Sequence, residues 1–326
     1  MVSKNNDFGL NSFLSSWQNM VQNLGVKPNV QSFVGSDQFA KIRSGFFEAM
    51  QKIEPDLPQM QEVRDFQIEN DGIVNLARAY TPHSAHHPVG PAIVFYHGGG
   101  FVMGDCDSYD SICRRLADAS GCRVLSVEYR LAPEHKFPSQ IDDSIFAFNW
   151  AHENAEKWGA DKSKIAVGGD SAGGNLAINI TRAALAGECP EPVFQLLIYP
   201  LTQFVDLKEK GVSFQEGSFF SPSIFDFCRS AYLEEGQSSR DLRVSPLFHD
   251  KFQGLPPAHV VTAGWDPLRD EGKAYFDKLC AAGVRATHQD YPSHPHGFYN
   301  STGVSKSARE AIAVAGQILS QALASK

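Results

Sequence analysis

The feature that most constrains the fold is an alternation of apolar, β-rich runs with helical segments, which continues from Ala92 to the C-terminus. Strand, helix and strand in succession are typical of βαβ units, which build a mostly parallel sheet with helices on both faces. We therefore predict an α/β fold. The apolar runs are Ala92–Tyr96, Arg123–Tyr129, Lys164–Gly168, Val193–Tyr199, His259–Ala263 and Arg285–Asp290. The helical segments are Ser108–Ser120, Gln140–Trp158, Gly174–Ala186, Asp270–Ala282 and Ser307–Ala324.

Three segments depart from this rhythm. Val63–Ile68 and Ile73–Tyr80 alternate like strands around Asn70-Asp71-Gly72, which predicts an antiparallel hairpin. Residues from about Phe8 to Met60 have helical spacing, and residues 203–240 are a mixed aromatic and polar insertion between two strands. We expect 1–60 and 203–240 to form a helical cap. The phenylalanines of the insertion either line a ligand pocket or form the core of the cap; they include Phe204, Phe214, Phe219, Phe220 and Phe225.

Composition narrows the classes of partner. The net charge is −8 and the basic residues are scattered, which argues against binding to nucleic acid or to an anionic membrane surface. The six cysteines form no CxxC pair, so we expect free thiols in a reducing compartment. The N-terminus lacks the apolar region of a secretory signal, and no apolar run reaches about 18 residues. These features favour a cytoplasmic protein without membrane insertion.

One short motif suggests a nucleophile. Gly169-Asp170-Ser171-Ala172-Gly173 fits G-x-S-x-G, with an apolar strand before it and a helical segment after it. Strand, tight turn and helix in this order are typical of a nucleophile elbow, in which Ser171 is exposed for attack. The N-terminus of the helix favours negative charge, so the Ala172 N–H is a candidate oxyanion donor. The alternative is a glycine-rich helix start with a capping serine.

A second motif, His97-Gly98-Gly99-Gly100-Phe101, directly follows an apolar strand. Consecutive glycines leave backbone N–H groups accessible, and an acyl-transfer intermediate needs two or three donors of this kind. We therefore predict that Gly99 and Gly100 contribute to an oxyanion hole, while His97 shapes the loop. The alternatives are a flexible loop without a ligand, or a phosphate cradle. A cradle would require a following Lys-Ser/Thr, which is missing.

Together with Tyr129–His135 and Asp266–Glu271, these motifs resemble the bacterial hormone-sensitive-lipase-like esterases from about Val63 to the C-terminus. The resemblance implies an α/β-hydrolase fold, with a catalytic domain at 61–202 and 241–326 beneath the cap. It also implies a carboxylesterase for small-molecule esters with short to medium acyl chains, which needs no metal or organic cofactor. Members of this family are often dimers, so the resemblance suggests a homodimer, although the sequence itself does not determine the oligomeric state.

The resemblance also assigns the remaining catalytic residues. Asp266, after the run 259–263, matches the family's acid, although an Asp before a Pro is also a common helix cap. His296 lies in the family's His-Gly-Phe pattern and matches the base. In the implied mechanism, His296, oriented by Asp266, takes the proton of Ser171 as it attacks the carbonyl. The rival acids are Asp270, Glu271 and Asp290, and the rival base is His294, which we expect to be a solvated loop residue.

Other readings stay open. The same triad would suit a lactone, an amide or a lipid ester, because the motifs do not specify the leaving group. A non-catalytic ligand-binding receptor is a further alternative. Arg130 and Glu134 are expected to form a buried pair near the site. A polar loop bounded by prolines carries three histidines that resemble a metal cluster, but we expect them to be solvated; they are His83, His86 and His87.

Overall fold

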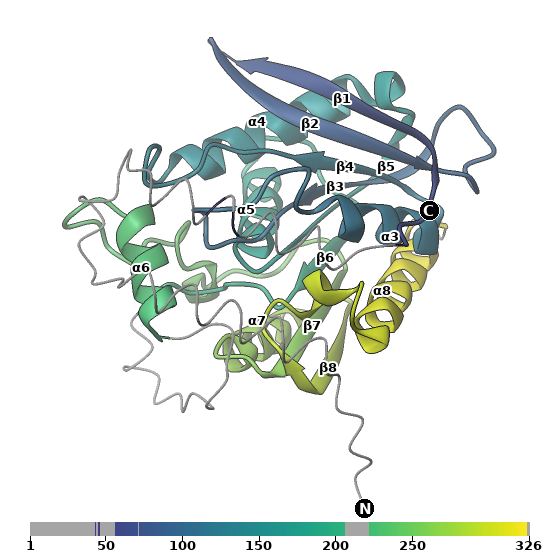
Figure 1. Ribbon diagram of the computed structural model, residues 1–326. Coiled ribbons are helices and arrows are strands. Elements are labelled where there is room, and N and C mark those ends of the chain that lie inside the picture. Colours follow the sequence, from purple (N-terminus) through teal and green to yellow (C-terminus); the bar gives the residue numbers. More distant parts are fainter. Residues whose placement is uncertain (1–42, 44, 46–55, 71, 206–221, 325–326) are drawn as a thin grey trace, which may run out of the picture.

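The computed structural model describes residues 43, 45, 56–70, 72–205 and 222–324. These residues contain an eight-stranded sheet with strand order β1-β2-β4-β3-β5-β6-β7-β8 (Figure 1). The strands β1 and β2 form an antiparallel hairpin, β2 is antiparallel to β4, and all later neighbours are parallel. The predicted mostly parallel sheet is therefore confirmed. The strands are β1 (Met60–Asn70), β2 (Ile73–Pro82), β3 (Gly90–Tyr96), β4 (Arg123–Val127), β5 (Ala160–Asp170), β6 (Gln195–Ile198), β7 (Ala258–Trp265) and β8 (Ala286–Pro295).

Helices cover both faces of this sheet. One pair, α3 and α8, packs together on one face, and α4 packs against α5 on the other (Figure 1). The strands between them are buried over most of their length, as β4 is at every residue, which explains why their sequences are largely apolar. The helices are α3 (Asp110–Ser120), α4 (Ser139–Glu153), α5 (Ala172–Leu185), α6 (Pro222–Tyr232), α7 (Arg269–Ala281) and α8 (Lys306–Ala324).

Several strands run further than their apolar runs predict, and the extensions of β5 and β8 bear on the site. β5 extends to Asp170, and β8 extends to Pro295 rather than ending near Asp290. In both cases the extra residues are held by pairing with a neighbouring strand, Asp170 with β6 and Pro295 with β7. Hydrogen bonds between strands do not depend on side-chain polarity, so hydrophobic periodicity misses such extensions. As a result, Ser171 and His296 directly follow the ends of β5 and β8.

The predicted cap is described only in part. Residues 1–42, 44, 46–55 and 206–221 lie outside the described residues, and with them Phe214, Phe219 and Phe220. Within the insertion, α6 is helical, and its Phe225 is fully buried against Phe204, with ring centroids 4.9 Å apart. The division into a cap and a catalytic domain therefore stays a prediction.

The expected pair of Arg130 and Glu134 is wrong. Arg130 forms an ion pair with Asp143 on α4 at 2.7 Å, and the same carboxylate accepts the backbone N–H of Arg130. Glu134 pairs at 2.8 Å with Arg43, 91 residues earlier in the chain. The choice of partner depended on packing between segments that are remote in sequence, which a local motif does not report.

Two further expectations concern the cysteines and membrane-spanning helices. All six cysteines lie in the described part of the chain and all are free. Over the same residues, every helix is too short or too polar to cross a lipid bilayer.

Candidate active site

The turn after β5 holds Ser171 in a strained conformation. Its φ of 53° lies in the left-handed region, which a residue with a side chain rarely adopts. Glycines make this turn possible, because a Cβ on Gly169 would lie 2.4 Å from Gly173, and a Cβ on Gly173 would lie 1.9 Å from the carbonyl oxygen of Tyr96. The turn and β3 are thus in backbone contact, as expected for a nucleophile elbow.

Three side chains converge at the carboxyl edge of the sheet. The Nε2 of His296 lies 2.8 Å from the Oγ of Ser171, and its Nδ1 lies 2.8 Å from the Oδ2 of Asp266. The three residues follow or end β5, β7 and β8, and each is buried, with exposed fractions of 7%, 5% and 8% for Ser171, His296 and Asp266. A hydroxyl, an imidazole and a carboxylate in this order form a connected hydrogen-bond chain.

Asp266 makes both of the contacts that its sequence context suggests. One oxygen of Asp266 faces His296, and the other accepts the backbone N–H of Leu268 at 2.7 Å, near the start of α7. The rival carboxylates have other surroundings. Asp270 is exposed, Glu271 accepts backbone N–H groups after β6, and Asp290 pairs with an arginine at the start of α7.

The rival base, His294, lies on β8 and does not contact Ser171. The Nε2 of His294 lies 2.7 Å from the Oγ of Ser307, and its ring packs on Phe298 at 4.6 Å. The expectation of a solvated residue is therefore wrong: His294 is half-buried, because α8 returns to cover the loop. The three histidines of the turn between β2 and β3 are exposed.

The glycine loop after β3 has an unusual backbone. Gly99, Gly100 and Phe101 have φ values of 105°, 64° and 66°, and a Cβ on Gly99 would lie 2.1 Å from the carbonyl oxygen of Met103. Only glycine fits the Gly99 position. Ala172 is the first residue of α5, so its N–H has no acceptor within the helix. The three residues that the sequence suggests as donors thus lie on two segments, the glycine loop, which touches the elbow at Asp170, and the start of α5.

Sequence reasoning missed the contact between this loop and α6. The ring of Phe101 stacks on that of Tyr232, with centroids 4.0 Å apart and planes at 12°. A Cβ on Gly100 would lie 2.4 Å from the Sγ of Cys228, so this thiol lies directly against the loop. The aromatic content of the insertion was the available signal, but it did not specify which residues meet.

His97 is an internal part of the loop rather than a base. Its ring is fully buried and stacks on Tyr129 with centroids 4.3 Å apart. Its Nδ1 lies 2.8 Å from the carbonyl oxygen of Gly98. Burial lowers the pKa of His97 to about 4, so the ring stays neutral near pH 7. This placement agrees with the expected loop-shaping role.

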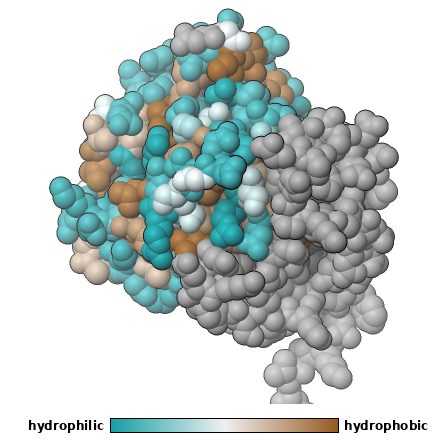
Figure 2. Space-filling model, turned by 90° about the vertical axis from the view of Figure 1, so that its left-hand side faces the viewer, coloured by the Kyte–Doolittle hydropathy of each residue, from teal (hydrophilic) through white to brown (hydrophobic). Residues whose placement is uncertain are grey.

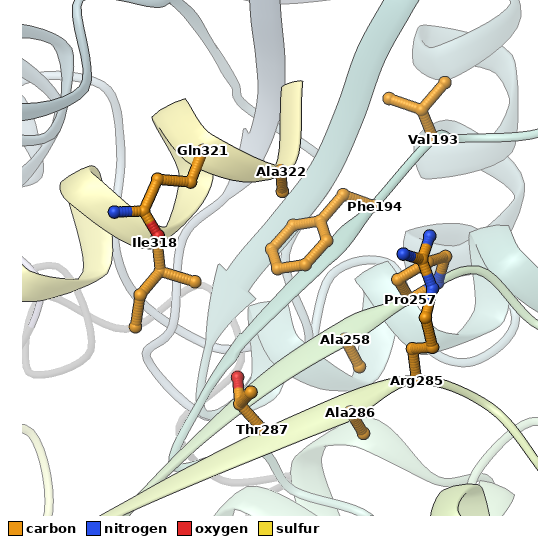
Figure 3. A pocket seen from close by; sticks show the side chains of 10 residues that line it. All are labelled: Val193, Phe194, Pro257, Ala258, Arg285, Ala286, Thr287, Ile318, Gln321 and Ala322. Atoms are coloured by element: carbon orange, nitrogen blue, oxygen red, sulfur yellow. The ribbon is translucent and has the colours of Figure 1, made fainter. Parts of the chain in front are cut away.

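A cavity of about 480 Å³ lies at the opposite edge of the sheet (Figure 3). It is formed where β6, β7 and β8 begin, whereas the linked serine, histidine and aspartate lie where the strands end. This cavity is therefore separate from the linked side chains. Its lining residues are Val193, Phe194, Pro257, Ala258, Arg285, Ala286, Thr287, Ile318, Gln321 and Ala322.

The fold and the site together are those of an α/β hydrolase. A family model described as the alpha/beta hydrolase fold matches residues 93–300, which is more than half of the chain, and the chain belongs to this family. Curated relatives from Mycobacterium tuberculosis support this placement. Carboxylic ester hydrolase LipN is 39% identical over 251 residues, 74% of this chain and 66% of LipN. Carboxylesterase NlhH is 37% identical over 268 residues, 80% of this chain and 82% of NlhH.

Solved structures agree. An ester hydrolase from the metagenome of Lake Arreo, in complex with a derivative of bipyridine phosphonate, is 38% identical, with a TM-score of 0.85. The match covers 95% of this chain and 96% of that one. The predicted place among the hormone-sensitive-lipase-like α/β-hydrolase esterases is confirmed.

Proposed function

We propose that this protein is a serine carboxylesterase in which Ser171 is the nucleophile, His296 the base and Asp266 the acid. The observation that carries the proposal is the chain of two 2.8 Å contacts from Ser171 through His296 to Asp266. Ester hydrolysis is the activity in the names of the relatives and of the similar structure, and it is the chemistry to which this arrangement is suited.

The proposed mechanism has two halves. His296 takes the proton of Ser171 as its oxygen attacks the ester carbonyl, and the N–H groups of Gly99, Gly100 and Ala172 hold the developing oxyanion. The alcohol leaves with the proton from the imidazole. Water then attacks the acyl-enzyme, again losing its proton to His296, and the acid is released. None of these steps uses a metal or an organic cofactor.

Short to medium acyl chains are the proposed substrates. Enzymes that act at a lipid interface expose a large apolar surface. On the described part of the face that carries α6, hydrophobic residues are interspersed with hydrophilic ones (Figure 2). Among the residues that the structure describes, the large hydrophobic ones that are exposed come from separate parts of the fold: Val63, Val74, Val89, Leu185, Leu242, Trp265 and Val314.

The first test compares Ser171→Ala with the wild type on p-nitrophenyl butyrate. We expect turnover to fall by about 10⁴-fold or more, and the burst of p-nitrophenol to disappear, while the melting temperature changes little. His294, on β8, and His296, which follows the strand, supply a matched pair. His296→Asn should lose activity to a similar extent, whereas His294→Asn should retain most of it. Near-native turnover by Ser171→Ala would overturn the proposal.

Assays with different substrates distinguish the remaining alternatives, which are another acyl bond or a non-catalytic receptor. A series of p-nitrophenyl esters from acetate to palmitate tests the proposed chain length, and a matched amide and a lactone test the leaving group. A non-catalytic receptor would bind such compounds without a burst. The homodimer and the cytoplasmic location stay predictions, which size-exclusion chromatography and cell fractionation would test.

A further inference from the structure

Asp170, the residue before the nucleophile, connects the elbow to the glycine loop. Its Oδ1 accepts the backbone N–H of Gly98 at 2.7 Å, and its Oδ2 lies 3.3 Å from the hydroxyl of Tyr109. The loop passes so close to the carboxylate that a Cβ on Gly98 would lie 2.6 Å from its Oδ2. Asp170 is 1% exposed, and the proposed mechanism gives it no role.

The loop needs such an attachment because its glycines do not fix the backbone by themselves. Gly99, Gly100 and Phe101 are consecutive residues with positive φ. The two glycines reach this region without strain and so do not hold the loop in one conformation, whereas Phe101 keeps a positive φ only where its surroundings impose it. Gly98 immediately precedes them, and Asp170 is covalently linked to Ser171. The hydrogen bond between Gly98 and Asp170 therefore connects the glycine loop to the residue next to Ser171.

We propose that Asp170 is a positioning residue, which holds the loop of Gly99 and Gly100 in register with Ser171 so that its N–H groups meet the oxyanion. This inference rests on the proposed function. It adds to the triad a second buried carboxylate, which acts on the oxyanion donors and not on the base. It predicts a loss of transition-state stabilisation without a matching loss of substrate binding.

The surroundings of Asp170 also suggest a pH signature. Burial raises the pKa of Asp170 to about 7, opposed by the hydrogen bond from Gly98 and by the nearby His296. An ionised carboxylate accepts a hydrogen bond more strongly than a neutral one, so the attachment strengthens as pH rises through about 7. The titratable groups that interact with it come from several parts of the fold: Tyr109, Cys113, Tyr129, Tyr199 and His296.

The experiment measures kcat, KM and the affinity for phenylboronic acid, which forms a tetrahedral adduct with a reactive serine. For Asp170→Ala we expect kcat to fall by about 100-fold, the boronic acid affinity to fall in parallel, and KM to change by less than about 3-fold. Asp170→Asn keeps an acceptor for the Gly98 N–H, so its kcat should be roughly tenfold higher than that of Asp170→Ala. The ratio of wild-type to Asp170→Asn activity should grow with pH through about 7.

Asp143 provides the matched control, because it is also a buried carboxylate that accepts a backbone N–H, that of Arg130. Asp143→Asn should lower the melting temperature without lowering kcat or the boronic acid affinity. If Asp170→Ala does not fold, Asp170→Asn and Tyr109→Phe carry the same measurements. The inference is overturned if the folded Asp170 variants keep wild-type kcat, or if their activity falls through a higher KM and not through a lower kcat. Failure of the proposed function would instead appear as a wild-type enzyme without ester turnover.

Discussion

At the scale of single residues, the elbow depends on the absence of side chains. Gly173 lies so close to β3 that an added Cβ would come within 1.9 Å of a backbone oxygen, where no flexible side chain can give way. Gly187, after α5, has a φ of 80° but has open space around its Cα. Gly173 is therefore required because there is no space for a side chain, whereas Gly187 is favoured only because its φ is positive.

We expect Gly173→Ala to lower the free energy of unfolding by about 3 kcal/mol and to abolish ester turnover, since the nucleophile must shift. Gly187→Ala pays only for its positive φ, and we expect a loss of about 1 kcal/mol with normal turnover. Urea denaturation and steady-state kinetics measure both effects. Equal losses of stability in the two variants would contradict the steric explanation.

A buried histidine predicts how stability depends on pH. Burial lowers the pKa of His259 from 6.5 to about 4, and its Nδ1 lies 2.8 Å from the hydroxyl of Thr287. As pH falls below 6.5, His259 binds a proton in the unfolded chain but stays neutral in the folded chain. The stabilisation from a neutral His259 is therefore complete above about pH 6.5 and is lost toward pH 4.

Between these values, His259 should contribute a slope of about 1.4 kcal/mol per pH unit to the free energy of unfolding. We expect His259→Gln to show a flatter decline than the wild type in urea denaturation at pH 4.5, 5.5 and 7. His83→Gln, at an exposed position, should follow the wild type. A slope unchanged by His259→Gln would show that another group carries the dependence.

At the scale of elements, α6 of the insertion supports the glycine loop. The stack of Phe101 on Tyr232 joins a residue with positive φ to the last turn of α6, and the loop also lies against Cys228. The hydroxyl of Tyr232 is buried, and no hydrogen-bond partner for it occurs among the described residues. The aromatic ring, rather than the hydroxyl, is therefore the contact that matters.

This arrangement predicts different results for two substitutions of one residue. Tyr232→Phe keeps the stack and should retain both kcat and stability. Tyr232→Leu removes the aromatic contact, which is worth about 1 kcal/mol, and we expect kcat to fall several-fold as the loop loses its support. Steady-state kinetics on p-nitrophenyl butyrate and thermal denaturation measure the effect. A loss of activity in Tyr232→Phe would assign the role to the hydroxyl instead.

At the scale of the whole molecule, contacts between remote segments complete the surroundings of the site. The guanidinium of Arg43 donates to the carbonyl oxygens of Val102 and Ala132 at 2.8 and 2.9 Å, and it pairs with Glu134. Val102 follows the glycine loop. One residue of the N-terminal region thus joins two loops above the carboxyl edge of the sheet.

We expect Arg43→Lys to lower the free energy of unfolding by about 1–2 kcal/mol, because an ammonium cannot reproduce the planar fork of donors. Glu134→Gln keeps an acceptor and should cost less. A double-mutant cycle of the two positions, measured by urea denaturation, should give a coupling energy of about 0.5 kcal/mol or more. A coupling near zero would mean that the pair is not formed in solution.

The sequence alone determined the α/β class, the hairpin, the order of strands and helices, and the motifs at Ser171 and Gly99. These features are local, since the polarity of neighbouring residues and the conformational range of glycine act within a few positions. The resemblance of motifs then selected Asp266 and His296 from several candidates.

Only the tertiary structure decided which groups meet. It brought His296 within 2.8 Å of a serine 125 residues away, gave Arg130 and Glu134 partners other than each other, placed His294 against α8, and set α6 under the glycine loop. Each outcome depends on close packing and hydrogen bonding between remote segments, which are properties of the assembled fold and leave no periodic signal in the chain.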